Sequence, residues 1–262
     1  MLMSGAERIA AAFSGRKGRA ALMPYMMGGF PDLETSLAIG NGYADGGADL
    51  IELGVPFSDP LADGPVIQSA GSAALASGAT LDVVVGVARE LSPRLPVVLM
   101  CYSNAILARE TERFVGEIAA AGVSGLIVPD LPLEEAPATA ESCAAAGVAF
   151  IGLAAPTSTD QRLAAIGEAT QGFLYTVAVA GTTGERGEES NYSEVIARVR
   201  SHTSAPVALG FGISTPEQAS AAADAGADGV IIGSRLVREA AQSPNPAEDC
   251  QLLVEQFAQA LR

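Results

Sequence analysis

The sequence is poor in the basic side chains on which many catalytic and metal-binding sites depend. Its 262 residues include one histidine, His202, and one lysine, Lys17. This scarcity argues against a Ser-His-Asp triad and against a histidine metal cluster. His202 stands among serine and threonine residues, which is typical of an exposed loop. Lys17 lies in a polar stretch before the first strand-like segment, so no strand-borne Schiff-base lysine is available.

Positive charge and long apolar runs are also scarce. Fifteen basic residues against thirty acidic ones give a net charge of −15, which argues against a nucleic-acid partner. The longest apolar runs, Val148–Pro156 and Phe173–Ala180, are about half the roughly 20 residues that span a bilayer, so we expect no membrane insertion. No secretory signal is visible, which predicts a cytoplasmic protein. Cys101, Cys143 and Cys250 lack paired spacing and are interpreted as reduced thiols.

One short pattern occurs four times along the chain. In each copy alanines finish a helix, a glycine stands where a left-handed helix stop is needed, and apolar residues then form a buried strand. The copies are Ala44–Gly54, Ala119–Pro129, Ala144–Ala154 and Ala223–Gly233. Each copy predicts a junction between a helix and a strand.

Four further strand candidates bring the total to about eight. They lie near Ala21–Met27, Pro96–Cys101, Gly172–Val177 and Pro206–Gly210. Regular alternation of strands and helices predicts a single (β/α)8 TIM barrel over residues 1–262, with parallel strands and an additional N-terminal helix. A doubly wound open sheet is the alternative, but residues 28–32 lack its G-x-G-x-x-G turn.

An acidic residue interrupts one of the four repeated strands. Where three copies carry Ile127, Gly152 and Ile231, the first carries Glu52. Burial shifts the pKa of an unpaired carboxyl group, which suits an acid/base catalyst. An interior hydrogen bond without chemistry, or a strand-end carboxylate that reaches water, would explain the same residue.

The segment after this strand contains two more acids. Residues 54–65 carry three prolines and two glycines, which indicate a shaped loop. Loops that follow barrel strands build the active-site face, so Asp59 and Asp63 would stand above the same mouth as Glu52. The alternative is that both are ordinary turn residues, and we favour that interpretation for Asp59.

Glycines follow the last two predicted strands. Gly210–Ser214 and Gly233–Arg235 each lead into a helical segment. In barrels of this class, backbone N–H groups of these two loops bind phosphate, and Arg235 could add a cation. Alternatively, the glycines only terminate turns.

The segment Ile51–Pro65 reads IELGVPFSDPLADGP and resembles the signature of the tryptophan synthase alpha subunit family. Other segments that occur in the family's order are Pro24-Tyr25, Tyr102–Asn104, Val128–Pro132, Gly181–Gly184, Gly210–Ser214 and Gly233-Ser234. The resemblance implies a (β/α)8 barrel that cleaves indole-3-glycerol phosphate to indole and glyceraldehyde 3-phosphate. It also implies a retro-aldol reaction that needs neither a metal nor a cofactor.

The resemblance also assigns roles to individual positions. Glu52 matches the general acid/base, and Asp63 matches the carboxylate that binds the indole N–H. Thr183 matches the threonine of a mobile loop that closes over substrate. Gly184, Gly212, Gly233 and Ser234 match phosphate-binding positions. The candidates for walls around the indole ring and glycerol chain, for which a pure core role is equally open, are Tyr25, Tyr102, Tyr175 and Phe211.

The family's partner is a beta subunit that carries pyridoxal phosphate, in an alpha2-beta2 assembly. The matching surface lies around Pro56–Asp59, Asn104 and Asp130–Pro132. The segment Val177–Gly184 departs from the family's usual sequence, so a stand-alone lyase of a specialised pathway and a catalytically silent activating subunit stay open. A ring-closing synthase of similar fold is disfavoured, because it relies on catalytic lysines.

Overall fold

The computed structural model describes residues 3–15, 18–178 and 192–262. Within these residues the strands form one sheet in the order β5-β4-β3-β2-β1-β9-β8-β7-β6, and every pairing is parallel. The strands are β1 Ala21–Met27, β2 Ile51–Gly54, β3 Val97–Met100, β4 Val123–Ile127, β5 Ala149–Phe150, β6 Leu153–Ala154, β7 Leu174–Val177, β8 Val207–Gly210 and β9 Gly229–Ile232.

The sheet closes into a barrel through its two shortest strands. β5 pairs with β4, β6 pairs with β7, and only two residues separate β5 from β6 in the chain. Across this gap, the Ile151 N–H donates to the Leu126 carbonyl at 2.9 Å, and the Gly152 carbonyl accepts from the Tyr175 N–H at 3.0 Å. One continuous segment therefore joins the two ends of the sheet, and the predicted (β/α)8 TIM barrel is confirmed.

The fifth strand is the one that departs from the prediction of a single unbroken strand. The Gly152 N–H donates to the Thr170 hydroxyl at 2.7 Å instead of extending the ladder. A Cβ atom at Gly152 would lie 2.7 Å from the Ile166 side chain, so the backbone runs close to the helix there. Glycine in a strand commonly marks such a close approach.

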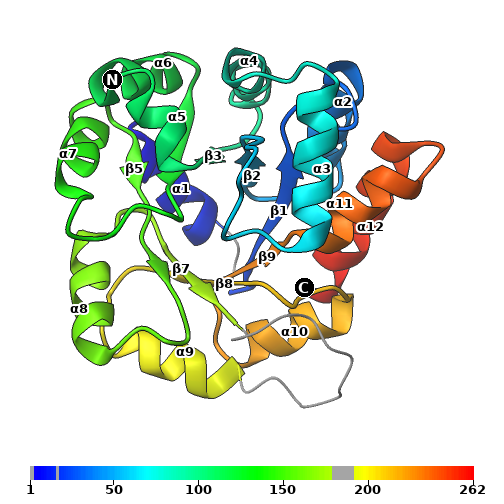
Figure 1. The fold of residues 1–262 in the computed structure, drawn as a ribbon. Helices are drawn as coiled ribbons and strands as arrows, with labels where there is room; N and C mark the ends of the chain where they lie inside the picture. The colour runs from blue at the N-terminus through cyan, green and yellow to red at the C-terminus, as the bar shows by residue number, and fades with distance from the viewer. Residues whose placement is uncertain (1–2, 16–17, 179–191) are drawn as a thin grey trace.

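Helices lie around the strands on all sides of the view in Figure 1. The described helices are α1 Gly5–Ser14, α2 Leu33–Asp45, α3 Pro65–Ala76, α4 Leu81–Leu91, α5 Ser103–Leu107, α6 Thr111–Ala120, α7 Pro137–Ala145, α8 Asp160–Ala169, α9 Tyr192–Arg200, α10 Pro216–Asp224, α11 Ser234–Gln242 and α12 Pro246–Ala260. None of them alone has the length and apolar character to cross a membrane, although α3 and α4 pass that test jointly across a 105° bend.

The predicted N-terminal helix covers the amino-terminal end of the barrel, which we call the floor. α1 begins with a capping box in which Ser4 and Glu7 bond each other's backbone N–H groups. Its Ile9 side chain is fully buried, and a Cβ at Gly125 or Gly172 would lie within 3.2 Å of it. The Phe13 ring packs against Phe173 with centroids 5.6 Å apart. α1 thus fills the space beneath the amino-terminal ends of the strands.

All four predicted helix stops adopt the left-handed conformation. The glycines at the repeated position, Gly47, Gly122, Gly147 and Gly226, have φ between 74° and 101°. Each lies directly between a helix and the strand that follows, where only glycine avoids a steric penalty. The helix stops predicted from the repeated pattern are therefore confirmed.

Two copies of the repeat also carry an aspartate that fastens the floor. Asp49 accepts the Leu22 N–H at 2.9 Å and bonds both terminal nitrogens of Arg19, at 2.8 and 2.9 Å. Asp228 occupies the equivalent position before β9 and accepts the Val207 N–H at 2.8 Å. Each carboxylate therefore caps the start of the neighbouring strand.

Candidate active site

Glu52 lies at the centre of β2 and is almost completely buried, with 1% of its surface exposed. In the ladder it stands beside Tyr25 of β1 and Val98 of β3. Its Oε2 atom has no hydrogen-bond partner among the described residues. Burial, and secondarily the charge of Asp63, raises the pKa of Glu52 to about 8. Glu52 is therefore a carboxyl group that stays protonated at neutral pH.

Asp63 lies at the end of the loop between β2 and α3 and is partly buried. Its N–H donates to the Pro60 carbonyl at 3.1 Å, and its own carbonyl accepts from Gln68 at 2.8 Å. Burial raises the pKa of Asp63 to about 6, against a smaller lowering by the Tyr102 hydroxyl. At neutral pH the site therefore contains one protonated acid and one ionised acid, which is the combination that proton transfer to a substrate requires.

Three tyrosines surround the two acids. Tyr25 and Tyr175 are buried, and desolvation together with the charges of Glu52 and Asp63 raises the pKa of both phenols. The third, Tyr102, follows β3, and burial followed by the charge of Asp63 raises its pKa. Because β7 lies far from β2 in the strand order, the interaction of Tyr175 with Glu52 runs through the barrel interior. Glu52 therefore points inward, and both acids face one space.

Glycines at two strand ends make room for the buried tyrosines. A Cβ at Gly54, the last residue of β2, would lie 2.0 Å from the Tyr25 hydroxyl. A Cβ at Gly210, the last residue of β8, would lie 2.5 Å from the Tyr175 hydroxyl. Both hydroxyl groups therefore fit only because the neighbouring strand ends in glycine.

The rim above β8 and β9 holds the predicted phosphate-binding positions that the structure describes. Phe211 has a positive φ of 65° and its ring meets Tyr175 edge-on at 6.2 Å. Gly212 follows with φ 87°. Gly233 caps α11 without a side-chain hydrogen bond, and Ser234 is the first helical residue. The rim therefore presents a helix N-terminus next to the tyrosines, since a Cβ at Gly233 would lie 3.9 Å from Tyr25.

Not every predicted residue joins this group. Thr183 and Gly184 lie outside the described residues, as does Lys17. Asp59 is exposed and accepts a hydrogen bond from the Ser58 hydroxyl at 2.5 Å, which fits the interpretation as a turn residue. The cation proposed for the phosphate, Arg235, is paired along its helix with Glu239.

The remaining residues with potential chemistry are the histidine and the three cysteines. His202 lies in a turn after α9, with its Nε2 3.8 Å from an Asp160 oxygen. All three cysteines are buried and free. Within the described part of the chain, no group of three or more His, Cys, Asp or Glu side chains is arranged to hold a metal ion.

Phe57 contacts the site but was not among the predicted site residues. Its ring stacks on Tyr102 with centroids 5.1 Å apart and planes inclined by 27°. The two residues come from loops after different strands, so their pairing leaves no local signal in the sequence. Gly54 and Gly210 stand within the predicted motifs, but the space that each leaves for a tyrosine hydroxyl depends on the fold.

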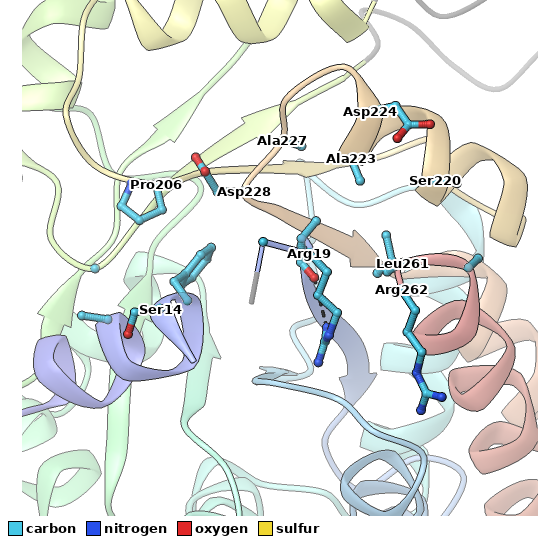
Figure 2. A pocket seen from close by; sticks show the side chains of 16 residues that line it. Ser14, Arg19, Pro206, Ser220, Ala223, Asp224, Ala227, Asp228, Leu261 and Arg262 are labelled. Carbon is cyan, nitrogen blue, oxygen red and sulfur yellow. Dashed lines mark hydrogen bonds between the residues drawn. The ribbon is translucent and has the colours of Figure 1, made fainter. Parts of the chain in front are cut away.

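A cavity of about 880 Å³ opens at the other end of the barrel, between α1, α10 and the end of α12 (Figure 2). Its lining includes Arg19, Pro206 and Asp228, which precede strands rather than follow them. Arg19 is paired with Asp49, and Asp228 is paired with Arg200 at 2.8 Å. The charged groups that precede its strands are therefore used to hold the floor together, and the acids with raised pKa lie at the opposite, carboxyl-terminal mouth.

These features define the chain as a (β/α)8 barrel of the enzyme type, with one acid in a strand of the barrel and a second on the loop that follows that strand. The model of the family "Tryptophan synthase alpha chain" matches residues 12–262. The chain belongs to the tryptophan synthase alpha chain family, which is a family of lyases.

Individual relatives cover nearly the whole chain. It is 48% identical to the tryptophan synthase alpha chain of Prochlorococcus marinus (strain MIT 9313) over 234 residues, 87% of this chain and 84% of the relative. With the alpha chain of Phenylobacterium zucineum it shares 45% identity over 265 residues, 97% and 95% of the two chains.

Solved structures show the same fold. A structure of Mycobacterium tuberculosis tryptophan synthase matches with a TM-score of 0.90 and 35% identity, covering 100% of this chain and 99% of the other. Tryptophan synthase subunit alpha from Legionella pneumophila matches with a TM-score of 0.89 and 31% identity, covering 99% of both chains.

Proposed function

We propose that this protein is the alpha subunit of tryptophan synthase and cleaves indole-3-glycerol phosphate to indole and glyceraldehyde 3-phosphate in tryptophan biosynthesis. One observation carries this proposal: Glu52 and Asp63 share one space, and burial raises the pKa of one to about 8 and of the other to about 6. Between these two values Glu52 is protonated and Asp63 is ionised. The two acids then offer a proton and a negative charge to the same substrate.

In this reaction Glu52 is the general acid/base. It gives its proton to C3 of the indole, and its carboxylate then accepts the proton of the side-chain hydroxyl as the carbon–carbon bond breaks. The hydroxyl becomes the aldehyde of glyceraldehyde 3-phosphate, and the electron pair of the broken bond restores the aromatic indole. One carboxyl group thus supplies one proton and recovers one, so no net proton is consumed.

Asp63 stabilises the intermediate. Protonation at C3 places positive charge on the indole nitrogen, and an ionised carboxylate that accepts the N–H hydrogen bond favours that charge. Its own pKa of about 6 keeps it ionised under the conditions in which Glu52 is still protonated. This difference between the two acids is the reason that they have separate roles.

The remaining predicted residues bind the two ends of the substrate. Backbone N–H groups around Gly212, Gly233 and Ser234 bind the phosphate, together with Gly184 of the preceding loop, and Thr183 belongs to the loop that closes over the substrate. Tyr25, Tyr175 and Phe211 enclose the indole ring and the glycerol chain. The ring of Phe211 is 41% exposed, which suits a side chain that a substrate would cover.

A beta subunit is the partner that we propose, in an alpha2-beta2 assembly. Two exposed leucines support a contact surface for this partner: Leu61, on the loop after β2, is 92% exposed, and Leu107, at the end of α5, is 69% exposed. Leu61 is in the same loop as Pro56–Asp59 and Leu107 is in the same helix as Asn104, so both are next to segments of the surface that we propose for the partner. We further propose that residues 1–262 act as one domain and that the protein is cytoplasmic.

An indole-release assay tests the proposed function. The purified chain is mixed with indole-3-glycerol phosphate, alone and with a beta subunit, and indole is measured directly. Release that Glu52→Gln abolishes supports the proposal, and stimulation by the beta subunit supports the assembly. A chain that releases no indole in either condition, including a single-turnover measurement, is not the lyase proposed here.

A further inference from the structure

Tyr102 contacts both ends of the loop that carries Asp63. At the beginning of this loop, the Tyr102 ring stacks on Phe57 at 5.1 Å between centroids. At its end, the Tyr102 hydroxyl oxygen accepts the N–H of Ala62 at 3.0 Å. Ala62 directly precedes Asp63, so a single side chain fixes the backbone on which the second acid is mounted.

The same hydroxyl group has a second interaction to offer. Its oxygen accepts from the backbone, which leaves its hydrogen to donate to the Asp63 carboxylate. A hydrogen bond to the charged form of an acid favours that form, and this interaction lowers the pKa of Asp63 against the opposing effect of burial. Because the pKa of Tyr102 itself is raised, the phenol remains a donor throughout the range in which Asp63 ionises.

Tyr102 is in turn held by the next loop along the barrel. Only 5% of its surface is exposed. The residue that follows it, Ser103, donates its N–H and its hydroxyl to the two oxygens of Asp130, each at 2.8 Å. Asp130 after β4 therefore holds the loop after β3, and Tyr102 in that loop holds the loop after β2, which carries Asp63.

We propose that Tyr102 is a positioning residue for Asp63, and that its hydroxyl group rather than its ring holds the second acid in place over the mouth. This inference rests on the proposed function, and it changes the role first expected for Tyr102, which was a wall for the substrate. The other ionisable groups that face Asp63 are Glu52 from β2, Tyr25 from β1 and Tyr175 from β7. Among the groups that face Asp63, Tyr102 is the one whose hydroxyl lowers the pKa of Asp63.

The test compares two variants that each lose one phenol hydroxyl near Asp63. Tyr102→Phe keeps the ring that stacks on Phe57 and removes the donor. Tyr25→Phe is the matched control, because its hydroxyl contacts the Met27 sulfur at 4.0 Å. The carboxyl carbon of Asp63, assigned by its loss in Asp63→Asn, is titrated by carbon-13 NMR in both variants and in the unmodified protein.

We expect Tyr102→Phe to raise the pKa of Asp63 by roughly one unit, the size that a hydrogen bond to a charged group gives. Tyr25→Phe should not raise it. The acidic limb of the pH profile of kcat/KM for indole-3-glycerol phosphate should move upward by the same amount in Tyr102→Phe. The loss would then be several-fold at pH 5.5 and small at pH 8, with KM little changed.

An Asp63 titration that is the same in Tyr102→Phe and in the unmodified protein would overturn the inference. So would a loss of activity that is equal at every pH, which would leave Tyr102 with a purely structural role. The carboxyl titration needs no turnover, so it decides the question about Tyr102 even if the unmodified chain releases no indole. The absence of indole would count against the proposed function alone.

Discussion

Replacing Glu52 with glutamine should stabilise the protein, and by an amount that grows with pH. In the unfolded chain the carboxyl group ionises near its ordinary pKa of 4.5, whereas in the folded chain the pKa is raised to about 8. Between these values the unfolded state releases a proton that the folded state retains, so rising pH favours unfolding. At about 1.4 kcal/mol per pKa unit, the cost approaches about 5 kcal/mol above pH 8 and is below about 1 kcal/mol at pH 5.

Urea unfolding at pH 5, 6.5 and 8 measures this effect. The difference in free energy of unfolding between Glu52→Gln and the unmodified protein should widen by about 3 kcal/mol from pH 5 to pH 8. Contributions of other titrating groups largely cancel in that difference. Ile231→Val is the matched control, since it changes the equivalent strand position of another repeat without a titrating group, and its effect should not depend on pH. A Glu52→Gln difference that is constant or shrinks with pH would refute the reasoning.

Three further predictions concern other parts of the molecule. Asp63→Asn should lower kcat for indole release by about 100-fold, because it removes the charge that stabilises the indole nitrogen, and the activity limb near pH 6 should vanish from the pH profile. Gly54→Ala should lower the free energy of unfolding by about 1–3 kcal/mol, because its Cβ would lie 2.0 Å from the Tyr25 hydroxyl. Adding Tyr25→Phe should recover part of this loss in urea unfolding. If the double variant recovers nothing, a clash with the Tyr25 hydroxyl is not the cause. Asp49→Ala should lower the free energy of unfolding by about 2 kcal/mol in the same assay, because it removes the carboxylate that bonds Arg19 and a backbone N–H of β1. An unchanged free energy of unfolding would show that the amino-terminal end of the barrel does not depend on this ion pair.

Much of the fold could be predicted, because it depends on patterns of neighbouring residues. The glycine stops at Gly47, Gly122, Gly147 and Gly226 each require a left-handed residue, and the apolar segments that follow them are short enough for strands. These are properties of neighbouring residues, so the sequence expresses them directly. The break in the fifth strand was not predicted, because it depends on Thr170 reaching the N–H of Gly152 from 18 residues away.

The candidate site divides in the same way. Glu52 could be found because a charged residue inside an apolar strand is visible in the sequence itself, and its burial follows from its place in β2. The size of the pKa shift of Glu52 could not be predicted, because it depends on the packing around this side chain and on the charge of Asp63. The stack of Phe57 on Tyr102 joins loops 45 residues apart, and neither residue alone indicates the other.

The helix α1 covers the amino-terminal end of the barrel axis. Ile9 lies beneath the strands with no exposed surface, and a Cβ atom at Gly125 or Gly172 would lie within 3.2 Å of it. Under the proposed function, substrate and both products cross the opposite, carboxyl-terminal rim, where the two acids lie. The linked loops after β2, β3 and β4 belong to this rim, so a change in how they are linked would alter the entry and exit of ligands as well as the chemistry.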